Sequence, residues 1–106
     1  MGYVYLICDP ANDRFKIGVT RKFDSNRVKK LQTGNSTELF VRYMYETEWP
    51  FRLEKFLHNK YANKRILNEW FALDVYDVNE FLLVCKQQED IIRALKDNPF
   101  FGKHLK

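Results

Sequence analysis

Two short stretches decide the fold of this chain: Tyr3-Val4-Tyr5-Leu6-Ile7-Cys8 and Arg14-Phe15-Lys16-Ile17-Gly18-Val19-Thr20. Both are rich in β-branched and aromatic residues, which favour strands. Between them lies Asp9-Pro10-Ala11-Asn12-Asp13, a run of residues that form turns. Together the three segments predict a β-hairpin.

Side chains of a strand alternate between two faces, so the hairpin divides its residues into two sets. If Cys8 pairs near Asp13, then Tyr5 lies opposite Lys16. One face carries an apolar set that suits a core: Val4, Leu6, Phe15 and Ile17. The other face carries a mixed, semi-polar set: Tyr3, Tyr5, Ile7, Lys16, Gly18 and Thr20. We interpret this second face as a working surface.

The rest of the chain predicts three helices and two further extended segments. Helices are expected over residues 24–32, 49–61 and 77–95, and extended segments over 38–46 and 69–73. The expected fold class is α/β (α+β), with a small three-stranded antiparallel sheet flanked by helices and a C-terminal helix. Its predicted core is the following set: Val4, Leu6, Phe15, Ile17, Val28, Leu31, Leu53, Phe56, Leu57 and Trp70.

Length and composition indicate one ordered domain. The chain has 106 residues, 45% of them hydrophobic and 16% aromatic, which excludes a disordered composition. We expect a core over residues 1–75 and a helical extension over 76–106 that packs on it. No apolar run approaches the length of a membrane span, and the N-terminus does not resemble a signal peptide. We therefore expect an intracellular protein, cytoplasmic or nuclear and not secreted, whose two cysteines, Cys8 and Cys85, are reduced.

A mild excess of positive charge suits an anionic partner. Eighteen Lys and Arg residues against fourteen Asp and Glu residues give a formal charge of +4, although many ordinary domains carry as much. Five cations are concentrated within ten residues: Arg21, Lys22, Arg27, Lys29 and Lys30. Arg27 flanks an apolar stripe, where its guanidinium could clamp a phosphate or could simply extend over the surface. This cluster predicts phosphate contacts along the first helix.

The helix expected over 49–61 carries the candidate metal ligand. Glu54 lies beside Leu53, at the margin of the buried stripe, and His58 shares its flank. A carboxylate at such a margin suits a hard metal ion, but a solvated glutamate is the commoner state. His58 alone is more often a hydrogen-bonded structural residue. Tyr5 beside Lys16 is either a base whose deprotonation the ammonium group favours or an ordinary cross-strand pair.

The ordered set of motifs is more specific than its parts. It comprises Val4-Tyr5-Leu6-Ile7, Lys16-Ile17-Gly18-Val19-Thr20, Arg27, Leu31-Gln32-Thr33-Gly34, Leu53-Glu54-Lys55-Phe56-Leu57-His58 and Glu69-Trp70-Phe71. This set, over residues 2 to about 73, resembles the GIY-YIG nuclease superfamily. It is most similar to the phage and bacterial branch with a Lys-Ile-Gly-x-Thr second motif and a Glu-Trp-Phe strand.

The resemblance implies a metal-dependent endonuclease that cuts phosphodiester bonds of nucleic acid, DNA more than RNA, by in-line attack. The implied catalytic residues are Tyr5, Lys16, Arg27, Glu54 and His58, and Glu54 is implied to bind one Mg²⁺ or Mn²⁺ ion. The implied substrate contacts are Gly18, Thr20, Arg21, Lys22, Lys29, Lys30 and Glu69. Lys16 stands where the superfamily has a tyrosine, which leaves the roles of Lys16 and His58 in activating water open. Two alternatives remain: a nucleic-acid-binding module that has lost cleavage, and a partner domain that works only when attached to another.

Overall fold

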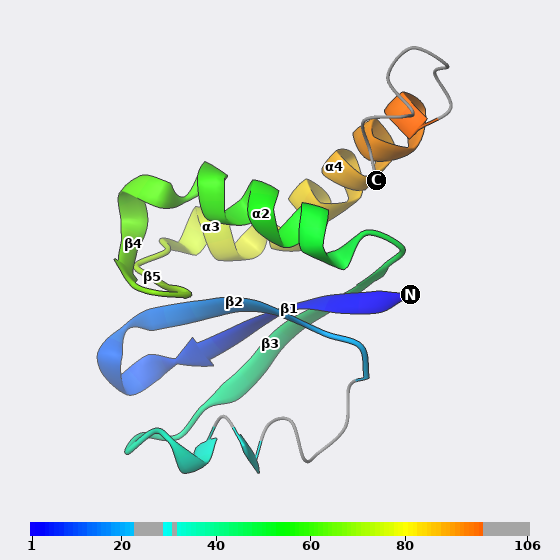
Figure 1. The fold of residues 1–106 in the computed structure, drawn as a ribbon. Coiled ribbons are helices and arrows are strands. Elements are labelled where there is room, and N and C mark those ends of the chain that lie inside the picture. Colours follow the sequence, from blue (N-terminus) through cyan, green and yellow to red (C-terminus); the bar gives the residue numbers. More distant parts are fainter. Residues whose placement is uncertain (23–28, 31, 97–106) are drawn as a thin grey trace.

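A five-stranded antiparallel sheet forms the centre of the fold, in the order β3-β1-β2-β5-β4 (Figure 1). The computed structural model describes residues 1–22, 29–30 and 32–96. The strands are β1 (Gly2–Asp9), β2 (Arg14–Thr20), β3 (Phe40–Thr47), β4 (Arg65–Leu67) and β5 (Trp70–Phe71). The helices are α2 (Pro50–Lys60), α3 (Val75–Asn79) and α4 (Phe81–Lys96), and single 3-10 turns cover Pro10–Asn12 and Ala62–Lys64.

The predicted hairpin is present, with a register that differs from the expected one. Asp9 pairs with Arg14, so Tyr5 lies opposite Gly18 and Ile7 lies opposite Lys16. The expected pairing of Tyr5 with Lys16 is therefore wrong by two residues. The tight turn over Pro10–Asn12, closed by Asp13 at φ 50°, extends the pairing to Asp9. A shift of two residues keeps the alternation, so both predicted faces keep their members.

The α+β class is confirmed, but the sheet is larger than the expected three strands. The expected third strand is β3, and the segment around Trp70 forms β5, which pairs with both β2 and β4. The single helix expected over 77–95 is divided in two. Asp74 caps α3 through a reciprocal pair of hydrogen bonds with Asp77, and α3 ends before Glu80. Most of the helix expected over 24–32 falls outside the described residues.

The main core lies between the sheet and the helices α2, α3 and α4, which cover one face of the sheet (Figure 1). Its members include Val4, Leu6 and Ile17 from the sheet and Leu53 and Leu57 from α2, all with 0% exposure. Buried residues of the last two helices join the same cluster: Val78, Phe81, Val84 and Cys85. Three residues expected to be largely buried are only partly buried: Phe15, Phe56 and Trp70. Val28 and Leu31 lie outside the described residues.

The opposite face of the sheet is covered as well. Residues 32–39 pass beneath this face in Figure 1, and Leu39 forms a second buried cluster with Tyr5 and Ile7. Tyr5 is only 2% exposed. On the face that we interpret as a working surface, Tyr5 and Ile7 are therefore buried, because the segment before β3 returns across them.

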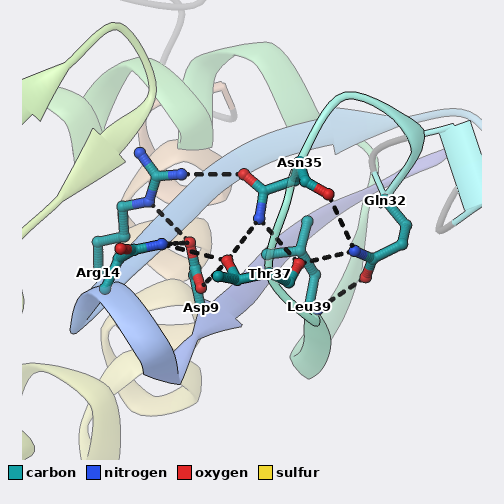
Figure 2. A network of polar contacts seen from close by, with 7 residues as sticks. Asp9, Arg14, Gln32, Asn35, Thr37 and Leu39 are labelled. Carbon is teal, nitrogen blue, oxygen red and sulfur yellow. Dashed lines mark hydrogen bonds and ion pairs between the residues drawn. The ribbon is translucent and has the colours of Figure 1, made fainter.

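A polar network fastens this covering segment to the hairpin (Figure 2). The Asp9 carboxylate has 0% exposure and accepts hydrogen bonds from Asn12 Nδ2 (2.9 Å), Arg14 Nε (2.9 Å) and Thr37 Oγ1 (2.7 Å). Arg14 Nη2 also donates to Asn35 Oδ1 at 2.9 Å. Burial alone would raise the pKa of Asp9, but these hydrogen bonds outweigh it and lower the pKa to about 2.

Gln32 closes the other side of the same loop. Its Nε2 donates to the Thr37 carbonyl at 2.7 Å, and its Oε1 accepts from the Leu39 backbone N–H at 2.7 Å. The loop that places Leu39 against Tyr5 is thus held by charge-assisted and amide hydrogen bonds at both ends. Among the described residues, no helix is long and apolar enough to cross a membrane.

Candidate active site

Two carboxyl groups and one ammonium group converge beside β2. Glu54 comes from α2, Glu69 from the turn before β5, and Lys16 from β2 itself. Lys16 Nζ lies 3.4 Å from Glu69 Oε2, and the Glu69 carboxyl is hydrogen-bonded to that of Glu54. The Glu69 carbonyl also accepts a hydrogen bond from the Ile17 N–H at 3.1 Å, which fixes this turn against the strand. Three residues predicted separately for the site are therefore brought together.

The environment of Glu54 disfavours its charged form. Burial is the largest cause, and the pKa of Glu54 is raised further by the charge of Glu69 and by the hydrogen bond with it. The nearby His58 acts in the opposite direction but does not cancel these effects. Glu54 is half-buried, so the solvated glutamate that its spacing left open does not describe it.

His58 lies next to this pair but is engaged in structural contacts. Its Nε2 is 3.0 Å from the Ile17 carbonyl oxygen, and because a carbonyl can only accept, Nε2 donates. Its Nδ1 lies 3.4 Å from Arg65 Nη2, and its ring meets Phe71 edge-on at 5.0 Å between centroids. These contacts favour the alternative of a hydrogen-bonded structural histidine.

Tyr5 reaches the same strand from the other side of the sheet. Its ring lies against Gly18, where an added Cβ would be 2.4 Å from the Tyr5 hydroxyl oxygen. Lys16 and Gly18 are two residues apart on β2, so their positions share a face with Tyr5. β5 pairs with β2 only at Phe15 and Lys16, and within the described part of the chain no strand pairs with this edge from Gly18 to Thr20. The Tyr5 side and the Glu54 side of the sheet therefore meet along this edge of β2, beyond its pairing with β5.

The predicted phosphate contacts divide into three groups. Arg21, Lys22, Lys29 and Lys30 are exposed. Thr20 Oγ1 donates to the Lys22 carbonyl at 2.7 Å, which gives its hydroxyl a role in the turn after β2. Arg27 lies outside the described residues, so its predicted convergence with Glu54 stays a prediction. Of these cations, Arg21 and Lys22 directly follow β2.

Several residues of this region were missed by the sequence reasoning. Asp9 and Arg14 were interpreted only as turn and strand residues, yet Arg14 holds Asp9 and also stacks 4.1 Å from the Trp70 ring centroid. A pairing register counted outward from Asp9 would have revealed the first contact. Glu69 was expected to contact substrate, and its hydrogen bond to Glu54 had no local signal because fifteen residues separate the two.

The carboxyl oxygens of Glu54 and Glu69 beside β2 are donors of the kind that a hard divalent ion takes. Carboxylate oxygens are the ligands that Mg²⁺ prefers, and Mg²⁺ commonly takes one or two of them while water and phosphate supply the rest. In residues 1–22, 29–30 and 32–96 there is no group of three or more His, Cys, Asp or Glu side chains that could hold a metal. Glu54 and Glu69 are the two carboxyl groups that lie together beside β2.

A family model, the T5orf172 domain, matches residues 2–86. The match includes every described strand, α2 and α3, and it ends within α4. No curated protein and no solved structure matches the chain.

Proposed function

This chain belongs to the T5orf172 domain family, which is GIY-YIG-like and nuclease-associated, and on that premise we propose that it is a metal-dependent endonuclease acting on nucleic acid, with DNA as the first substrate to test. The observation that carries the proposal is the half-buried Glu54 carboxyl, which interacts with the Glu69 carboxyl beside β2. When both carboxyl groups are ionised, they repel each other in a partly desolvated place, and that state is costly. A divalent cation relieves that cost.

Glu54, assisted by Glu69, would hold one Mg²⁺ or Mn²⁺ ion. When bound, such an ion supplies neutralisation of the phosphate and of the leaving oxygen. Lys16 is already paired with Glu69, so it keeps positive charge at the site and limits the repulsion between the carboxylates. Arg27, which the GIY-YIG resemblance assigns to the scissile phosphate, stabilises its developing charge.

Tyr5 orients the attacking water in this proposal. Because Tyr5 is enclosed on its own face, the water reaches its hydroxyl along the edge of β2 at Gly18, where the ring meets the backbone. His58 holds α2 against β2 through the Ile17 carbonyl and so keeps Glu54 in place. The exposed cations Arg21, Lys22, Lys29 and Lys30 bind phosphates on either side, which makes binding depend steeply on salt.

The test is cleavage of supercoiled plasmid and of labelled DNA and RNA oligonucleotides, single- and double-stranded, with Mg²⁺, with Mn²⁺ and with EDTA. We expect cleavage that requires metal, is lost in Glu54→Gln and persists in Glu48→Gln, whose side chain is exposed just before α2. Glu54→Gln should still bind nucleic acid. Binding without cleavage of any substrate by the unaltered protein would favour the alternative function, a nucleic-acid-binding module.

A further inference from the structure

A cavity of about 340 Å³ lies where the end of β2 meets the start of α2. Its lining residues are Val19, Thr20, Arg21, Pro50 and Phe51. We propose that this cavity binds one unpaired nucleobase, which stacks on Phe51 while the adjoining phosphate contacts Arg21. The proposal rests on the proposed nuclease function and narrows its substrate class to single-stranded or locally unpaired nucleic acid.

Phe51 has the properties of a stacking platform. It is 65% exposed, although phenylalanine is a residue that folding normally buries. Stacking on an aromatic ring tolerates any base, because every base has a π face. The neighbouring cation, Arg21, is exposed and complements the phosphate of the same nucleotide. The cavity volume is at the small end of the range for ligand sites, which suits one base better than a larger group.

The walls of this cavity are held in place by close packing. A Cβ added to Gly2 would be 3.0 Å from Pro50 Cγ and 3.3 Å from the Thr20 carbonyl oxygen. The first residue of β1 therefore fills the space between the start of α2 and the end of β2. Pro50 follows the N-cap residue of α2, where its fixed φ suits the helix. The backbone that carries Phe51 is therefore held in place before a ligand binds, which lowers the entropic cost of binding.

The cavity is aligned with the carboxyl pair along one flank of α2. Phe51 and His58 are seven residues apart and so lie on nearly the same line of the helix, and His58 contacts Ile17 of β2. Glu54 lies between them, about one turn from Phe51. A base held at Phe51 thus brings a phosphate of the same strand close to Glu54. In a perfect duplex both faces of each base are already stacked, so the arrangement selects unpaired nucleotides.

The experiment measures binding in EDTA, where no cleavage occurs. The probes are a short single-stranded oligonucleotide, a duplex of the same sequence and that duplex with one bulged base, with 2-aminopurine at the unpaired position. We expect Phe51→Ala to weaken binding of the single-stranded and bulged probes by about 5- to 150-fold and to leave the perfect duplex unchanged. Stacking of 2-aminopurine on residue 51 should quench its fluorescence. Phe51→Trp should retain both this quenching and the affinity. Tyr76→Ala, an exposed aromatic on α3, is the matched control and should change nothing.

Two outcomes would overturn the proposal. Either Phe51→Ala weakens all three probes equally, or it weakens none of them while thermal unfolding shows a folded protein. The second outcome would indicate that the exposed Phe51 ring contacts a protein partner instead of a base. These results are separable from the test of the nuclease itself. If binding in EDTA depends on Phe51 as expected but no cleavage occurs in Mg²⁺, only the proposed nuclease function fails. If cleavage occurs and Phe51→Ala changes neither cleavage nor binding, only the proposed base-binding cavity fails.

Discussion

The Tyr5 ring lies so close to Gly18 that no side chain fits between them: an added Cβ would be 2.4 Å from the hydroxyl oxygen and 2.5 Å from Cζ. Gly18 does not have a positive φ, so it is required for this close approach and not for its backbone conformation. Tyr5 is 2% exposed and packed with Ile7 and Leu39, which leaves its ring little room to move aside.

Gly18→Ala is therefore expected to displace Tyr5. The overpacking should lower the free energy of unfolding by about 1–3 kcal/mol. A shift of the hydroxyl by about 1 Å should reduce the cleavage rate by roughly 100-fold if Tyr5 orients the water. Urea denaturation and single-turnover cleavage measure the two effects. Gly34→Ala is the control, since nothing lies within 4 Å of a Cβ added there. A Gly18→Ala protein as stable and as active as the unaltered one would contradict the close approach.

Asp9→Asn should remove much of the fastening between the hairpin and the loop at Thr37. Both carboxylate oxygens of Asp9 accept hydrogen bonds. In the asparagine variant one of them is replaced by an NH2 group, which would face at least one of the present donors and could not accept from it. We expect a loss of about 3 kcal/mol, the lower end of the range for a buried ion pair that loses one partner. Asp13→Asn, exposed in the same turn at positive φ that asparagine tolerates, should have little effect.

The same carboxylate predicts a specific dependence of stability on pH. The pKa of Asp9 in the folded protein is about 2, below the ordinary aspartate value of about 3.9 in the unfolded chain. A lowered pKa contributes stability that is fully present above the unfolded value and is lost as pH falls through the folded one. Urea denaturation between about pH 4 and pH 2 should show this loss in the unaltered protein. The Asp9→Asn protein should show a shallower decline, and equal slopes would argue against the network.

The two faces of the hairpin could be predicted from the sequence because alternation is a local property. The register could not, because it depends on where the turn closes, and this was decided by the Asp9–Arg14 pair. The cover over Tyr5 was also beyond local reasoning, since the Thr37 hydrogen bond to Asp9 spans 28 residues.

The candidate site shows the same division. Helical phase placed Glu54 at the margin of the buried stripe, and the structure has it half-buried there. What the sequence could not supply is the partner, because Glu69 is brought to Glu54 by the pairing of β5 with β2, a tertiary event. Phe51 was missed for a related reason. Its exposure becomes meaningful only when the end of β2 lies beside it.

Glu54→Gln should make the protein more stable while removing its activity. The raised pKa of Glu54 means that the folded state binds the proton more tightly than the unfolded chain does. Its contribution to stability is therefore favourable at low pH and is lost as pH rises through the folded pKa, so the charged group is a burden at neutral pH. Glutamine is uncharged at pH 7 and so removes this destabilising effect of the ionised carboxylate. Thermal unfolding at pH 7 should show a higher midpoint for Glu54→Gln and no change for Glu48→Gln.

The loss of activity in Glu54→Gln should exceed the roughly 10- to 100-fold that is usual when a second-sphere partner of a metal ligand is removed. A variant that is less stable than the unaltered protein would show that Glu54 is a structural residue. A variant that is more stable and still active would show that the strained carboxyl has another purpose.

Glu69→Gln should move the acid limb of the cleavage profile to lower pH. Cleavage in this proposal requires ionised Glu54, so its raised pKa places the limb above the ordinary glutamate value of about 4.3. The substitution removes the charge that opposes ionisation of Glu54, while burial, the larger cause, remains. The limb should therefore shift toward 4.3 without reaching it. Rates measured under single-turnover conditions from pH 4 to pH 8 at one fixed metal concentration below saturation give the shift, because a saturating metal ion would displace the proton from Glu54. Glu38→Gln, which is exposed, serves as the control.

Lys16 loses its partner in the Glu69→Gln protein, so Lys16→Met is measured beside it. That change leaves the Glu69 charge in place and should move the limb in the opposite direction, to higher pH. Acid limbs that coincide in the unaltered, Glu69→Gln and Lys16→Met proteins would mean that Glu54 and Glu69 do not interact in solution, and the carboxyl pair would no longer support the site.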